Sequence, residues 1–227
     1  VVALYALIYI GPSVPISLPE STLGLSANAA WILILFAYAA IASLLPVWML
    51  LQPRDYINGL QLFVGLILLY AAVLIANPLV VAPMINFGVP ENTPSMIPLL
   101  FVTIACGAIS GFHGLVASGT TSKQLNKETD ARFVGYFGAV GEGALALAAI
   151  IAATAGFATL SDWQAVYSAF GQGGVQAFVD GGAAILSAGT GLDAAVAGTM
   201  LTVMAALFAG TTMDTGLRLQ RYIFQEW

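Results

Sequence analysis

The sequence predicts an all-α protein, a polytopic transmembrane helix bundle. Of its 227 residues, 59% are hydrophobic and only 7% are charged, whereas soluble domains carry about 25% charged residues. The mean hydropathy is +0.93. Several uncharged stretches are also long enough to cross the bilayer, because a helix of roughly 20 residues spans its hydrocarbon core of about 30 Å. A net charge of −5 argues against a nucleic-acid partner, which would need a basic surface.

The first half of the chain predicts three spans. Residues 1–10 form an apolar run without an initiator methionine, so we expect a helix whose beginning is missing and a chain that is a piece of a longer protein. Residues 29–51 carry no charge and have a tryptophan near each end, where aromatic side chains favour the membrane interface. We expect a short turn at 52–59 and a third span at 60–76.

The second half predicts three more spans within the same single transmembrane domain, residues 1–227. We expect them at 96–118, at 133–160 and at 194–213. Residues 161–191 are rich in Gly and Ala, and there we expect a short interfacial helix around 163–170 followed by a re-entrant or surface segment. Residues 215–226 predict an amphipathic helix along the interface.

The positive charges predict the orientation of these spans. If each span reverses direction, all six Lys and Arg residues fall on one side of the membrane. The charged residues of the loops on the other side are then all Asp or Glu. This bias is the positive-inside rule. We therefore expect residues 52–59, residues 119–132 and the C-terminus to be cytoplasmic. The six residues are Arg54, Lys123, Lys127, Arg132, Arg218 and Arg221.

The span at 96–118 predicts a broken helix near 107–118. Its run FVTIACGAISGFHGLVASGTTSK, Phe101–Lys123, places glycines and hydroxyls around the chain's only histidine. Glycine weakens a helix by about 1 kcal/mol relative to alanine. Lipid cannot satisfy the freed backbone groups, so an opened helix must face protein or water. Many transporters build a substrate or ion site in this way.

Two ionisable residues inside predicted spans are candidates for function. His113 is expected to bind a carboxylate substrate or to carry a proton, since a histidine pKa is easily moved across physiological pH. Glu142 is expected to couple transport to a proton or cation, because an ionised carboxylate in the membrane is costly unless it is paired or bound. The alternative for each is a satisfied hydrogen bond between helices.

The polar residues of the broken helix complete the candidate substrate and ion site. Its hydroxyls are candidate ligands for Na⁺, and the alternative is that they cap the helix and bond to their own backbone. The full set is Ser110, Gly111, His113, Gly114, Ser118, Thr120, Thr121 and Glu142.

Two charged pairs outside this site are read as structural. Asp214 and Arg218 are four residues apart, the spacing of an ion pair on one helix face. Arg54 and Asp55 are read as an anchor of the turn and of the topology.

The sequence gives no support for enzyme chemistry of the soluble kind. The single Cys106 excludes an internal disulfide, and the single His113 excludes three-histidine metal and bis-histidine haem sites. Walker, HExxH, GxSxG and CxxC motifs do not occur. We therefore expect no cofactor beyond a coupling H⁺ or Na⁺, and no catalytic or metal-binding residues.

Four stretches together resemble the carbon starvation protein A family of bacterial membrane transporters. They are LLPVWMLLQPRDY (Leu44–Tyr56), ACGAISGFHGLVASGTTSKQL (Ala105–Leu125), ARFVGYFGAVGEGALA (Ala131–Ala146) and MDTGLRLQRYIFQE (Met213–Glu226). The resemblance implies a symporter in the bacterial inner membrane that takes up peptides, amino acids or pyruvate. It also implies the inverted-repeat, APC/LeuT-like fold with discontinuous helices, and a longer protein of which this chain is a central part.

The sequence thus predicts a fragment of a secondary active transporter for small carboxylated metabolites or peptides, coupled to H⁺ or Na⁺. The expected partners are the small-molecule substrate, the lipid bilayer and the rest of the transporter. The alternative of a different class is a non-transporting membrane scaffold or sensor subunit. The sequence leaves open the exact substrate, the coupling ion and the oligomeric state.

Overall fold

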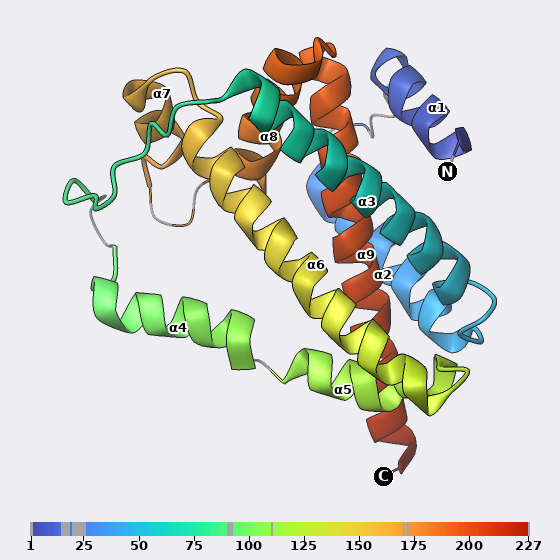
Figure 1. Cartoon of the computed structure of the whole chain (residues 1–227). Coiled ribbons are helices and arrows are strands. Elements are labelled where there is room, and N and C mark those ends of the chain that lie inside the picture. Colours follow the sequence, from blue (N-terminus) through green and yellow to red (C-terminus); the bar gives the residue numbers. More distant parts are fainter. Residues whose placement is uncertain are drawn as a thin grey trace. The chain divides into compact units, whose positions relative to one another are not determined.

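A computed structural model describes residues 2–14, 19, 26–89, 93–109, 111–169, 171 and 173–226. Within these residues the regular secondary structure is helical throughout, without a β-strand (Figure 1). Four helices are long and apolar enough to cross a membrane: Ala27–Leu44, Leu51–Ala76, Glu128–Ala155 and Ala194–Gln225. The prediction of an all-α, multi-pass membrane protein is therefore confirmed.

The helices divide between two compact units, whereas the sequence predicts a single domain. The first unit comprises Val1–Ile67 and Leu192–Trp227, and the second comprises Leu68–Gly191. The helices follow in the order α1 (Val2–Ile10), α2 (Ala27–Leu44), α3 (Leu51–Ala76), α4 (Met96–Ile109), α5 (Phe112–Gly119), α6 (Glu128–Ala155), α7 (Leu160–Val166), α8 (Gly174–Thr190) and α9 (Ala194–Glu226), with short 3₁₀ helices η1 (Gly11–Ser13) and η2 (Thr121–Gln124).

In the first unit, α9 packs against α1 and α2 and runs antiparallel to the first half of α3. Two contacts give this direction. Asp214 lies 3.1 Å from Arg54 near the start of α3, and a Cβ added at Gly65, farther along α3, would lie 3.0 Å from the sulfur of Met204. Since the α9 residue number falls as the α3 number rises, the start of α3 and the C-terminal part of α9 lie at the same end of this unit.

In the second unit, α6 and α8 meet through small residues. A Cβ added at Gly181 would collide with the carbonyl oxygen of Ala152, and one added at Gly156 would collide with the backbone of Gly181. Small residues let helix backbones approach closely, a common way to pack helices in membranes. The backbone contact leaves no room for any larger side chain at these two glycines.

The last turns of α3 also belong to the second unit, where they run in the same direction as α6. The hydroxyl of Tyr70 donates to the carbonyl of Ala144 at 2.7 Å. Farther along, the backbone N–H of Val81 donates to the carbonyl of Thr154 at 2.9 Å. Both residue numbers rise together, as the alternating topology inferred from the charges requires.

The turn predicted at 52–59 is instead the beginning of α3, and the predicted span 60–76 is correspondingly too short. The chain turns earlier, after α2 ends at Leu44. Leu45 is extended with φ −73° and ψ 151°, the conformation that a following proline, here Pro46, favours. Pro53 falls in the first turn of α3, where the N–H that proline lacks would have no helical partner in any case.

The C-terminal region also differs from the prediction. α9 is continuous over 33 residues, so residues 215–226 do not form a separate amphipathic helix. Within the segment that the sequence left open, α7 is a short helix and α8 is a 17-residue helix. Its buried residues include Ala183, Ile185 and Leu186, so α8 packs into its unit as a helix in its own right.

Candidate functional site

The predicted broken helix is interrupted at Gly111. α4 ends at Ile109 and α5 begins at Phe112, and Gly111 has φ +76° in the left-handed region. Side chains other than glycine lose roughly 1–2 kcal/mol in this conformation. The glycine therefore permits the left-handed residue that precedes α5, and Figure 1 shows α4 and α5 as separate segments. The candidate site residue Ser110 lies outside the residues that the structure describes.

His113 lies in the first turn of α5 and its side chain is exposed. Its ring meets that of Phe112 edge-on, with centroids 5.9 Å apart. Gly114 follows, and a Cβ added there would have open space around it. The site therefore has an accessible imidazole beside a helix interruption.

Glu142 lies in the middle of α6 with its side chain exposed. Open space surrounds the neighbouring glycines Gly138, Gly141 and Gly143. Among the residues that the structure describes, no hydrogen bond or ion pair joins Glu142 to His113. The structure does not bring the two ionisable groups together as a pair.

Two of the candidate hydroxyls bond to their own helix. Ser118 donates to the carbonyl of Leu115 at 3.1 Å, and Thr120 donates to the carbonyl of Val116 at 2.8 Å. Thr120 is buried, whereas Thr121 is half-buried at the start of η2. This is the local capping arrangement that the sequence left as an alternative. A hydroxyl oxygen that donates its proton still has lone pairs with which to accept.

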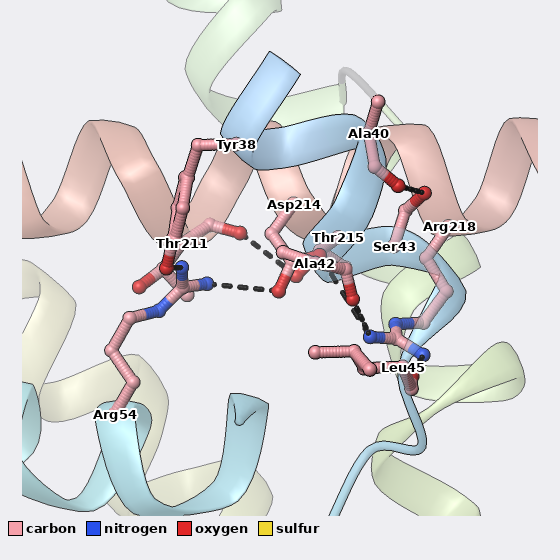
Figure 2. A network of polar contacts seen from close by, with 10 residues as sticks. All are labelled: Tyr38, Ala40, Ala42, Ser43, Leu45, Arg54, Thr211, Asp214, Thr215 and Arg218. Atoms are coloured by element: carbon pink, nitrogen blue, oxygen red, sulfur yellow. Dashed lines mark hydrogen bonds and ion pairs between the residues drawn. The ribbon is translucent and has the colours of Figure 1, made fainter. Parts of the chain in front are cut away.

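A second polar cluster lies in the first unit and joins α2, α3 and α9 (Figure 2). The carboxylate of Asp214 lies 3.1 Å from Nη2 of Arg54 and 3.8 Å from Nη2 of Arg218. The side chains of Asp214 and Arg218 are 0% and 1% exposed, and that of Arg54 is 14% exposed. The cluster thus buries two guanidinium groups around one carboxylate.

The two arginines each reach α2 as well. Arg218 donates from Nη1 to the carbonyl of Leu45 at 2.7 Å and from Nη2 to that of Ala42 at 2.9 Å. These carbonyls lie at the end of α2, where the last turn of a helix has unpaired acceptors and partial negative charge. Arg54 donates from Nη1 to the hydroxyl of Tyr38 at 3.2 Å. Arg218 therefore caps α2, and the cluster ties three helices together.

Two further polar side chains extend the cluster along α3. Asn58 and Gln61 are 5% and 0% exposed, and they follow Arg54 by four and seven residues, which places all three on one helix face. Oδ1 of Asn58 and both amide atoms of Gln61 are buried without a hydrogen-bond partner.

The sequence pattern did not predict this cluster as a unit. Arg54 was expected to anchor a turn, because residues 52–59 were expected to form one. The spacing of Arg54, Asn58 and Gln61 is the signal that would have indicated a polar helix face. The expected ion pair of Asp214 with Arg218 is present at 3.8 Å, and it extends to Arg54 and to α2. Asp55, beside Arg54, is exposed.

The geometry defines a multi-pass membrane protein with an interrupted helix and a buried cluster of charges. The family described as carbon starvation protein CstA matches residues 1–160. The chain belongs to this family.

Several relatives carry the names of transporters. The peptide transporter CstA of Helicobacter pylori is 44% identical over 132 residues, which are 56% of this chain and 19% of that protein. The pyruvate/proton symporter BtsT of Escherichia coli is 43% identical over 125 residues, 53% of this chain and 17% of that protein. The peptide transporter CstA of Bacillus subtilis is 32% identical over 254 aligned positions, 99% of this chain and 42% of that protein.

The matched regions thus span less than half the length of each of these relatives. No solved structure matches the chain.

Proposed function

We propose that the chain is part of a secondary active transporter that moves small carboxylated metabolites such as pyruvate, or peptides and amino acids, together with H⁺ or Na⁺. The interruption of the helix at Gly111 carries the proposal. Lipid offers no partners to backbone groups freed at such a break, so they require protein, water or a bound ligand. Discontinuous helices form substrate and ion sites in many transporters, and the names of the relatives support this class.

In this proposal the residues of the site have different roles. The exposed His113 contacts the carboxylate of the substrate or carries a proton. Glu142 on α6 holds the coupling H⁺ or Na⁺, because an exposed carboxylate within a span needs a cation, a proton or water. The oxygens of the candidate hydroxyls remain available as acceptors. The proposed site is Ser110, Gly111, His113, Gly114, Ser118, Thr120, Thr121 and Glu142.

The proposal includes an orientation in the bacterial inner membrane. In the first unit, the ion pair between Arg54 and Asp214 supports a common side for the start of α3 and the C-terminal part of α9. We place that side in the cytoplasm, following the positive-inside rule, together with residues 119–132. We also propose that the interrupted helix belongs to one half of an inverted-repeat, APC/LeuT-like transporter.

Uptake by the full-length protein in proteoliposomes tests the proposal. Radiolabelled pyruvate and a dipeptide are supplied in parallel, with an imposed proton gradient and then a sodium gradient. We expect one gradient to drive uptake, and Glu142→Gln to abolish at least nine-tenths of that stimulation. The matched control is Glu128→Gln, since Glu128 lies exposed in the first turn of α6 and outside the proposed site.

The scaffold or sensor alternative predicts different results. A scaffold would show no gradient-dependent uptake although folded protein is present in the vesicles, and His113→Gln would impair its assembly. A transporter with His113→Gln should fold and should lose uptake or its pH dependence. Equal uptake by wild type, His113→Gln and Glu142→Gln would refute the assigned roles.

A further inference from the structure

A cavity of about 430 Å³ lies in the first unit between α1, α3 and α9. Its lining is largely apolar, with Leu4 and Leu7 from α1, Ile57 from α3 and Leu207 from α9. Arg54 is the charged residue in its wall. Small-molecule sites have volumes of roughly 300–1,000 Å³ and combine an apolar lining with a few polar groups that orient the ligand. The cavity has these properties, and none of the residues of the proposed transport site line it.

A cluster of charged side chains lies behind the cavity wall. Arg54 and Arg218 carry two positive charges, and Asp214 between them carries one negative charge. All three side chains are largely withdrawn from solvent, and an uncompensated buried charge costs several kcal/mol. Asp55, the neighbour of Arg54, supplies a second negative charge that interacts with Arg54 and with Asp214. Arg54 is the group that can hold an anion in the cavity, since it is the charged residue that lines the cavity.

Arg54 has the capacity to bind that anion. Its contacts to Tyr38 and Asp214 are 3.2 and 3.1 Å long, longer than the roughly 2.7–2.9 Å of strong charge-assisted hydrogen bonds. Its Nε is buried without a partner. Asp214 keeps Arg218 as a partner if Arg54 turns to a ligand. An exchange of one carboxylate for another at Arg54 therefore leaves no buried carboxylate unpaired.

We propose that this cavity binds a small anion with an apolar body, whose charged group competes with Asp214 for the guanidinium of Arg54. The apolar body fills the space between Leu4, Leu7 and Leu207. Occupancy loosens the contact between α3 and α9 that the ion pair makes. The proposal goes beyond the transport function, because binding here requires neither the interrupted helix nor an ion gradient. A soluble carboxylate and an acidic lipid share this chemistry, and the experiment separates them.

Isothermal titration of the purified full-length protein in a neutral detergent tests the proposal. The probes are hexanoate and its neutral analogue hexanamide. Because Arg54→Gln alone leaves Asp214 with one partner fewer, it is combined with Asp214→Asn. A second variant, Ile57→Trp, fills the cavity and keeps the ion pair. The matched control is Lys127→Gln, which removes an exposed cation of the second unit.

We expect hexanoate to bind wild type and Lys127→Gln equally, and to bind both cavity variants at least tenfold more weakly. Hexanamide should bind wild type at least tenfold more weakly than hexanoate. In the lipid arm, native mass spectrometry compares retention of phosphatidylglycerol with that of phosphatidylcholine. Selective retention of phosphatidylglycerol that both variants lose would identify the lipid as the source of the anion.

Two results would overturn the proposal. One is hexanoate affinity that is the same in wild type and in both cavity variants, each monodisperse with unchanged helix content, without selective lipid retention. The other is the absence of any binding of hexanoate and any preference for phosphatidylglycerol in wild type.

Discussion

Replacing Arg218 with methionine should remove the cap of α2 at a large cost in stability. The side chain is 1% exposed and donates two hydrogen bonds to the carbonyls of Ala42 and Leu45. Hydrogen bonds to charged groups contribute about 1.5–3 kcal/mol each, so the pair contributes about 3–6 kcal/mol. Asp214 keeps Arg54 as a partner at 3.1 Å, so the substitution leaves no buried carboxylate unpaired and the cost comes from the lost carbonyl contacts. We expect Arg218→Met to lower the free energy of unfolding by about 3–5 kcal/mol, since methionine retains much of the apolar volume.

Unfolding in mixed micelles with increasing sodium dodecyl sulfate, followed by circular dichroism, measures this change. The matched control is Arg221→Met, one turn farther along α9. Arg221 is half-buried, and its guanidinium lies 5.1 Å from the ring centre of Tyr222, an interaction of roughly 0.5–2 kcal/mol. If Arg218→Met destabilises the protein no more than Arg221→Met does, the two carbonyl contacts do not stabilise the fold and the reasoning is refuted.

Two glycine substitutions test the packing and the interruption. Gly181→Ala places a methyl group against the carbonyl of Ala152 and should cost about 1–3 kcal/mol through overpacking. Gly143→Ala is the control, because a methyl group there meets open space and should be neutral or slightly stabilising. Equal midpoints of thermal unfolding for Gly181→Ala and Gly143→Ala would contradict the close contact of α6 with α8. Gly111→Ala forces an L side chain into φ +76° and should cost about 1–2 kcal/mol and reduce uptake in proteoliposomes. Gly114→Ala should leave stability unchanged. Equal stability of Gly111→Ala and Gly114→Ala would argue against a strained backbone at Gly111.

Hydrophobic runs and glycines predicted the parts of the fold that depend on local chemistry. Bilayer thickness sets the length of an apolar helix, so the apolar runs alone indicate the spans that correspond to α2, α3, α6 and α9. The interruption was predictable because only glycine adopts the left-handed conformation at no steric cost. Gly111 meets that requirement within a run that several other glycines already weaken.

The buried cluster could not be predicted because it depends on tertiary contacts. Its contacts join α2, α3 and α9, and 160 positions separate Arg54 from Asp214. The turn was also misplaced, since Pro53 reads as a helix breaker although the first helical turn tolerates it. With Arg54 assigned to a loop, its alignment with Asn58 and Gln61 on one helix face was lost.

The segment 161–191 was not predicted for a different reason. α8 is amphipathic, but glycine disfavours a helix by about 1 kcal/mol per residue relative to alanine, and the glycines Gly174, Gly181, Gly182 and Gly189 therefore argue against a helix when only the sequence is considered. Its packing rests on backbone approach at Gly181, which only the arrangement of α6 and α8 reveals. Gly173 and Gly174, at φ +90° and +38°, mark its beginning, and glycines in such positions are common in loops as well.

The helix α3 contributes to both proposals. It supplies Arg54 to the first unit, and Tyr70 to the second, where the Tyr70 hydroxyl donates to the carbonyl of Ala144. Ala144 lies two residues from Glu142 on α6. α3 therefore supplies the anion-binding residue of the proposed cavity in the first unit and, in the second unit, a hydrogen-bond donor to the backbone of α6 two residues from the proposed coupling carboxylate.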